Sequence, residues 1–169
     1  MLLAVLGACG AEPEADQTSW SSGREPPNQF FQPEEEVQLS HSQVLYVPVY
    51  SNILTGNGAR PTEMAATLAL RNTDRDSPIF VTSVAYYDTA GQLIETFLDG
   101  MFGLSPMASA SIFINVSDTR GGFGANFIVE WGATEPVSEP MIEAVMVGSA
   151  GTKGFSFTSP AKVIESDER

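Results

Sequence analysis

The regular spacing of short apolar runs between residues 44 and 163 constrains this chain more than any other feature. Each run is rich in β-branched and aromatic residues and is bounded by Gly, Pro, Asn or Asp, which favour turns. The runs cover residues 44–50, 64–71, 79–87, 92–98, 109–116, 126–131, 141–147 and 155–158. About eight short strands without a convincing helical period predict an all-β fold, an immunoglobulin-like antiparallel β-sandwich, over residues 43–164.

Alternation along these runs predicts which side chains share a face. In the first run, Leu45, Val47 and Val49 are expected on one face, with Tyr46 and Tyr50 on the other. Later strands give the sets Ala66, Leu68 and Leu70; Phe80, Val84 and Tyr86; Ile112, Ile114 and Val116; and Phe127, Val129 and Trp131. Residues 88–91 predict a hairpin turn, in which Asp88 suits the start and Gly91 supplies a positive φ.

The charged and metal-binding residues exclude several functional classes. The chain has 8 basic and 21 acidic residues and a net charge of -13 at pH 7. Because neutralising phosphates needs clustered Lys and Arg, this balance argues against a nucleic acid partner. A single Cys and a single His exclude an internal disulfide and any multi-Cys or multi-His metal site. No metal and no cofactor are therefore expected.

The N-terminus resembles the signal of bacterial lipoproteins. Leu6-Gly7-Ala8-Cys9 follows the lipobox pattern, in which a Leu stands three residues before the lipidated Cys with small residues between. The resemblance implies that residues 1–8 are a signal remnant and that Cys9 carries acyl chains such as palmitate. It places the protein in the bacterial cell envelope, on the periplasmic or extracellular side of a membrane. Gly10 is compatible with the outer membrane. The alternative is a short apolar strand with a buried Cys.

Residues 9–42 are expected to form a disordered tether that begins with the lipidated Cys9. The segment is rich in Glu, Pro, Gln and Ser, and such a composition buries too little apolar area to offset chain entropy. Like charges would stiffen it and hold the domain off the membrane. Phe30 and Phe31 interrupt the polar pattern and suggest a local contact with the domain. An acidic docking arm is the functional alternative, and residues 165–169 are expected to be an acidic tail.

Five blocks of sequence resemble a bacterial family of small secreted proteins known as domain of unknown function 3124. They are LYVPVYSNIL at 45–54, LRNTDRDSPIFVTSVAYY at 70–87, SDTRGGFGANFIVEW at 117–131, PMIEAVMVG at 140–148 and GFSFTS at 154–159. Together they span nearly the whole predicted domain. The resemblance implies no established activity.

The segment 117–126 is the leading candidate for a binding loop. Gly121, Gly122 and Gly124 permit unusual backbone conformations, and successive N–H groups there would suit an anion. Arg120 would add a forked donor, with Asp118 and Asn126 beside it. The alternative is a structural loop in which Asp118 pairs with Arg120. The segment lacks the Gly-Lys-Ser/Thr ending of a nucleotide loop.

Other candidates are weaker. Tyr46 and Tyr50 form an aromatic patch if both point outward, since Tyr is enriched at interfaces. His41 lies at the edge of the domain, where a solvated side chain is the usual finding. Asp74, Asp76 and Asp88 are near turns and lack a recognised calcium loop.

These observations predict a lipid-anchored envelope protein of unknown molecular activity, a binding or assembly module and not an enzyme. Its partners would be the membrane, through the lipid, and another envelope protein. One alternative is a domain that binds a small anionic ligand through residues 118–126. A more remote alternative is a hydrolase that uses two carboxylates.

Overall fold

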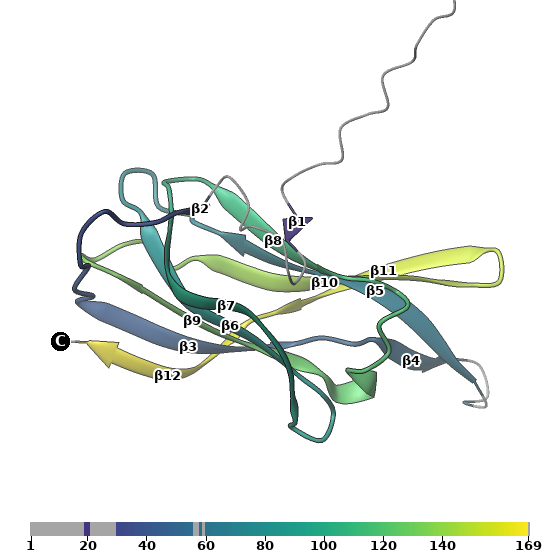
Figure 1. Ribbon diagram of the computed structural model, residues 1–169. Coiled ribbons are helices and arrows are strands. Elements are labelled where there is room, and N and C mark those ends of the chain that lie inside the picture. The colour runs from purple at the N-terminus through teal and green to yellow at the C-terminus, as the bar shows by residue number, and fades with distance from the viewer. Residues whose placement is uncertain (1–18, 21–29, 56–57, 59, 169) are drawn as a thin grey trace, which may run out of the picture.

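The computed structural model describes residues 19–20, 30–55, 58 and 60–168. Twelve strands in these residues form two packed sheets, and the all-β sandwich predicted from the sequence is confirmed (Figure 1). Four strands outside the eight predicted runs make up the difference, namely the short strands at residues 19–20, 30–31 and 52–55 and the strand at residues 162–168. No helix within this part of the chain is long and apolar enough to cross a membrane.

The first sheet has the order β1-β8-β5-β10-β11, with β4 paired to β5. Its pairs are antiparallel except for β1 with β8, which is parallel. The strands are β1 (Ser19–Trp20), β4 (Asn52–Thr55), β5 (Arg60–Arg71), β8 (Ser109–Ile114), β10 (Met141–Ala150) and β11 (Lys153–Pro160).

The second sheet has the order β12-β3-β9-β6-β7-β2, and all of its pairs are antiparallel. The strands are β2 (Phe30–Phe31), β3 (His41–Pro48), β6 (Ile79–Tyr87), β7 (Leu93–Leu104), β9 (Asn126–Ala133) and β12 (Lys162–Glu168). Residues 165–168, expected to be a tail, lie in β12 and pair with the start of β3. Their acidic side chains charge this edge strand, which discourages pairing with another chain.

The core lies between the two sheets and follows the predicted alternation at most positions. Leu45, Val47 and Val49 are buried, as are the sets from β5 and β9 (Ala66, Leu68, Leu70, Phe127, Val129 and Trp131). Val116 is an exception, because β8 ends at Ile114 and leaves it 45% exposed. The predicted turn is also present: Gly91 has a φ of 75°, and its N–H donates to the carbonyl of Asp88.

Phe80 does not share a face with Val84 and Tyr86, contrary to the prediction. A bulge between Val81 and Ser83 shifts the register of β6 against both neighbouring strands. Val81, Val84 and Tyr86 therefore belong to the central core, whereas the ring of Phe80 lies 6.2 Å from that of Phe31. An extra residue in one strand reverses the facing of everything after it.

Residues 30–40, here called the strap, lie on the second sheet although they belong to the predicted tether. Phe30 and Phe31 pair with the end of β7 as β2. A Cβ atom at Gly103 would overlap the ring of Phe31, and one at Gly132 would lie 2.8 Å from Leu39 Cδ1. Two glycines, one in β7 and one in β9, thus make room for two apolar side chains of the strap.

The sandwich has two distinct ends. The strap leads into β3 at one end, here called the base, where β5, β7 and β9 finish and the connections 72–78, 105–108 and 134–140 lie. The opposite end, here called the tip, holds the connections 49–51, 88–92 and 115–125 (Figure 1). Strand β3 runs from the base toward the tip, antiparallel to β9. The two-residue strand β1 is parallel to β8, which also runs from the base toward the tip.

Candidate functional site

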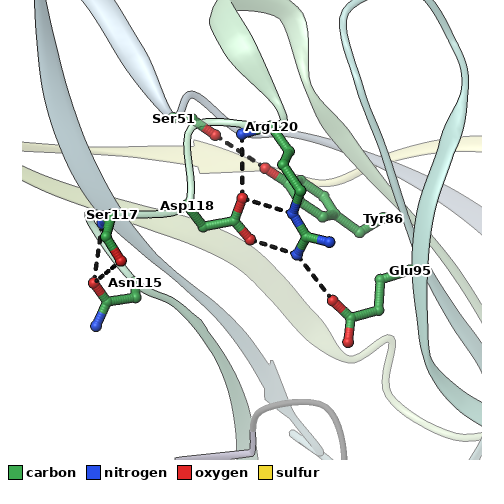
Figure 2. A network of polar contacts seen from close by, with 7 residues as sticks. All are labelled: Ser51, Tyr86, Glu95, Asn115, Ser117, Asp118 and Arg120. Atoms are coloured by element: carbon green, nitrogen blue, oxygen red, sulfur yellow. Dashed lines mark hydrogen bonds and ion pairs between the residues drawn. The ribbon is translucent and has the colours of Figure 1, made fainter.

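The candidate loop at 115–125 lies at the tip, and its charged side chains bind one another. Arg120 donates from Nε to Asp118 Oδ1 at 2.9 Å and from Nη2 to Asp118 Oδ2 at 2.6 Å. Nη2 also lies 3.1 Å from Oε2 of Glu95, which comes from the neighbouring β7 (Figure 2). The predicted pairing of Asp118 with Arg120 is therefore what the loop contains, with Glu95 as a third member.

The opposite charges of this network compensate one another. The two-pronged contact with Arg120 lowers the pKa of Asp118, and the same contact raises the pKa of Arg120. Two carboxylates face one guanidinium, so the three groups together carry a negative charge. An incoming anion would have to displace Asp118 or Glu95, at the cost of a charge-assisted hydrogen bond.

Gly121 is required because the loop packs directly on a buried pair of hydroxyls. The hydroxyls of Tyr86 and Ser51 are 3.0 Å apart and buried. A Cβ atom at position 121 would overlap the Tyr86 hydroxyl and lie 2.7 Å from Ser51 Oγ. Burial also raises the pKa of Tyr86, so this phenol is a neutral structural group. Figure 2 places the ring of Tyr86 below the backbone of Arg120.

The backbone groups of the loop glycines also form hydrogen bonds with Thr89 and Ser51. The N–H and the hydroxyl of Thr89 both donate to the carbonyl of Gly121, at 3.0 and 2.9 Å. Thr89 Oγ1 accepts the N–H of Gly124 at 2.9 Å, and the carbonyl of Gly122 accepts the N–H of Ser51 at 3.1 Å. Of these groups, the N–H of Gly124 is a donor of the kind that the anion hypothesis required, and it is bonded to Thr89. Together the bonds join the loop to the other two connections of the tip.

The remaining members of the segment have local roles. Asn115 Oδ1 accepts both the N–H and the hydroxyl of Ser117, each at 3.0 Å, which shapes the turn after β8 (Figure 2). Asn126 begins β9 and pairs with Pro48 on one side and Tyr87 on the other. Phe123, in a short 3-10 helix η1 (Gly122–Gly124), is 45% exposed.

Tyr46 and Tyr50 do not face the same surroundings. Tyr46 lies within β3, paired with Ile128 and Lys162, and is half-buried. Tyr50 lies beyond the end of β3, where its ring packs 5.8 Å from that of Phe157 in the other sheet. Tyr50 thus closes the edge of the core between the sheets.

Two of the three carboxylates considered for calcium, those of Asp74 and Asp88, hold turns. Asp74 Oδ1 accepts the N–H groups of Asp76 and Ser77, and Oδ2 accepts that of Ser138 at 2.8 Å. These bonds lower its pKa to about 2. Asp88 accepts two N–H groups within its hairpin. Within the described part of the chain, no three His, Cys, Asp or Glu side chains gather as metal ligands do.

A polar cluster at the base was missed by the sequence reasoning. Gln43 is buried, and its Oε1 accepts the indole N–H of Trp131 at 3.2 Å, while its Nε2 donates to Glu139 at 3.4 Å. The ring of His41 lies 5.5 Å from that of Trp131. In the sequence, the only indication of this cluster is a Gln at an inward position of an otherwise apolar strand. That indication does not reveal which residues Gln43 contacts.

Several open clefts adjoin this cluster, and two of them share His41. One of the two, of about 710 Å³, is lined by the end of the strap and in part by Leu39, His41 and Met101. The other, of about 630 Å³, includes Glu135 and Glu139. Glu135 accepts the hydroxyl of Ser77 at 2.7 Å, and Glu139 accepts Nε2 of Gln43, so the two carboxylates join the connection 134–140 to the connection 72–78 and to β3.

Cys9, the expected lipidation site, lies outside the described residues.

Comparison with known proteins gives one family. The sequence profile of the family described as "Protein of unknown function (DUF3124)" matches residues 42–164. None of the curated proteins matches the chain. Among solved structures, the crystal structure of Thermotoga maritima 1070 is similar, with a TM-score of 0.39 and 11% identity, over 71% of this chain and 92% of that one.

Proposed function

The chain belongs to the DUF3124 family, and we propose that it is a non-enzymatic binding or assembly module, held at a bacterial envelope membrane by a lipid on Cys9. The observation that carries the proposal is the internal pairing at the tip. Asp118, Arg120 and Glu95 bind one another, and Gly121, Gly122 and Gly124 bind Thr89 and Ser51 or pack on Tyr86. The residues that were the strongest candidates for ligand binding are thus engaged in contacts within the domain.

The membrane part of the proposal rests on Leu6-Gly7-Ala8-Cys9 and on the acidic segment that follows. Acyl chains anchor a protein to the membrane surface and leave its domain in the aqueous phase. The test is expression of the full chain and of a Cys9→Ser variant in a bacterial host, followed by fractionation and intact-mass measurement. The wild type should fractionate with membranes with an acylated Cys9, and the variant should not. If the wild-type protein is recovered in the soluble fraction with an unacylated Cys9, the proposed membrane attachment is wrong.

The anionic-ligand alternative has less support, because Arg120 already faces two carboxylates. If an anion were the ligand, Arg120→Ala would abolish its binding while the sandwich stayed folded. We expect Arg120→Ala to fold and to retain the partner of the wild type. Loss of the partner from this folded variant would favour the alternative.

The hydrolase alternative is favoured by one observation, the cleft at the base that includes Glu135, Glu139 and His41. Glu135 accepts a hydrogen bond from Ser77 in the connection 72–78, and Glu139 accepts one from Gln43 in β3. Both carboxylates thus attach the connection 134–140 to the rest of the domain, which fits a structural role. A panel of glycoside substrates tests this alternative directly. Turnover by the wild type that is lost in Glu135→Gln and Glu139→Gln would revive it.

A further inference from the structure

The edges of the two sheets differ in how well they are protected against pairing with another chain. Among the described residues, β1 and β2 have two residues each, and β4, which lies off the first path, has four. The edge strand β12 carries three carboxylates between residues 165 and 168. Short and charged edges resist pairing. β11 has eight residues, and its segment 154–159, between Lys153 and Pro160, contains neither a charge nor a proline.

The backbone of β11 directs every second residue away from its neighbour β10. The N–H of Ala161, directly after the strand, donates to the carbonyl of Ile142 at 2.9 Å, so residue 161 faces β10. Because both backbone groups of a residue in an antiparallel pair point to the same side, alternate residues before 161 also face β10. The N–H and C=O groups that point away belong to Gly154, Ser156 and Thr158, and Pro160 follows in the same series. In the described part of the chain, β11 pairs with β10 alone.

Two copies of β11 are complementary to each other in one antiparallel register. With a twofold axis at Ser156, this residue lies opposite itself, and Gly154 lies opposite Thr158 of the second copy. Each outward residue then exchanges both of its backbone hydrogen bonds. An axis at Phe157 would instead bring Pro160 into the pairing, where an N–H donor is missing. The backbone therefore favours the axis at Ser156.

The side chains of β11 suit the same register. With the axis at Ser156, Phe155 of one copy stands opposite Phe157 of the other, on the core side of the sheet. Both rings are half-buried against the core, and the ring of Phe157 lies 5.8 Å from that of Tyr50. Aromatic side chains directly opposite each other stabilise an antiparallel pair. The outward face would bring together only the small side chains of Ser156, Gly154 and Thr158.

Charge also favours β11 as the place where two copies meet. Each copy has a net charge of -13, so two copies repel where their acidic surfaces approach. The segment 154–159 is uncharged, and Lys153 would lie opposite Ser159 of the second copy. No like charges therefore face each other across the paired strands.

We propose that two copies of this chain join through their β11 strands, so that one sheet runs continuously through both molecules. Figure 1 shows the hairpin of β10 and β11, with β11 in yellow, extending beyond the body of the sandwich, where a second copy can reach it. The inference rests on the assembly part of the proposed function, for which it names a second copy as the partner. An extended peptide of another protein would use the same backbone groups, but β11 matches itself in hydrogen bonds, aromatic rings and charge.

Disulfide crosslinking of the full chain in a bacterial host tests the register. Residues of a hydrogen-bonded antiparallel pair have Cα atoms about 5.5 Å apart, which a disulfide can span. Oxidation should therefore link Ser156→Cys into a covalent dimer. The matched control is Thr158→Cys, which is exposed on the same face of the same strand. Its two copies would lie four residues, about 13 Å, out of register and should not link. The wild type controls for Cys9.

Analytical ultracentrifugation of the full chain in mild detergent tests the interface without a crosslink. Ser156→Pro removes an N–H that points away from β10, so the fold and the unfolding temperature should stay as in the wild type. The dissociation constant of the dimer should rise roughly tenfold or more, because backbone hydrogen bonds across the axis are lost. Ser156→Thr keeps the N–H and should dimerise as the wild type does.

Three results would overturn the β11 dimer. They are a wild type that stays monomeric, a folded Ser156→Pro variant that dimerises like the wild type, and disulfides formed equally by Ser156→Cys and Thr158→Cys. A monomeric wild type that captures another protein, and loses it with Ser156→Pro, would assign the edge to that protein instead. None of these results removes the proposed function, because binding of a different envelope protein does not require a second copy.

Discussion

The ring of Phe31 occupies the space that a Cβ atom at Gly103 would need. At Gly132 a Cβ atom would lie 2.5 Å from the carbonyl oxygen of His41 and 2.8 Å from Leu39 Cδ1. The next residue of the strap, Ser40, donates its N–H to the carbonyl of Ala133 at 2.9 Å. A segment with the composition of a tether is thus attached to the sheet through two glycines that have no side chain to obstruct it.

Gly103→Ala should release the strap, because the new methyl group would overlap the ring of Phe31. Amide hydrogen exchange across residues 30–40 should then accelerate by roughly tenfold or more, which corresponds to about 1.4 kcal/mol. The matched control is Gly154→Ala in β11, whose Cβ would meet nothing closer than 4.0 Å. Unchanged exchange in Gly103→Ala would show that the strap is not held at this point.

Gly121→Ala should destabilise the domain by about 1–3 kcal/mol, the usual cost of forcing extra volume into a packed site. The new Cβ would overlap the Tyr86 hydroxyl. Urea unfolding measures the effect. In a Tyr86→Phe background, which lacks that hydroxyl, the same substitution should cost less. An equal cost in both backgrounds would mean that the phenol does not limit the fit.

Asp74→Asn should change how stability depends on pH. The three N–H donors lower the pKa of Asp74 to about 2 from its usual 3.8. Because the folded-state pKa lies below the unfolded value, this group stabilises the fold above about pH 4, and the contribution disappears as pH falls toward 2. The difference in unfolding free energy between wild type and Asp74→Asn should shrink over that window. The control is Asp76→Asn in the same turn; a constant difference for Asp74→Asn would contradict the assignment.

Gln43→Met should cost about 1–3 kcal/mol, because the buried indole N–H of Trp131 loses its acceptor. Circular dichroism during urea unfolding gives the value without relying on Trp fluorescence. If the hydrogen bond is the cause, Gln43→Met should cost less in a Trp131→Phe background. A cost that does not depend on residue 131 would point to packing.

Much of the fold follows from the sequence, because alternation and turn chemistry are local. The faces of β3, β5 and β9 were predicted correctly, and Gly91 has the positive φ expected of the turn. The pairing of Asp118 with Arg120 was also within reach, since the two residues are only two positions apart and their charges are opposite.

The remaining features depend on residues that are far apart in the chain. Glu95 and Thr89 reach the loop only because β6 ends and β7 begins beside it, and no sequence pattern connects them to Arg120. Phe80 was placed on the wrong face, because a bulge after Val81 leaves no local mark. The strap was attributed to the tether by composition, and its glycine partners lie in β7 and β9, long after it in the sequence.

The most direct test of a membrane-held binding module is quantitative capture of its partner from native membranes with the anchored full chain as bait. We expect the partner captured by the wild type to be retained by Arg120→Ala, and to fall at least about tenfold with Cys9→Ser, which is not held at the membrane beside the partner. Equal capture by all three proteins, or none above a bait-free control, would contradict the account.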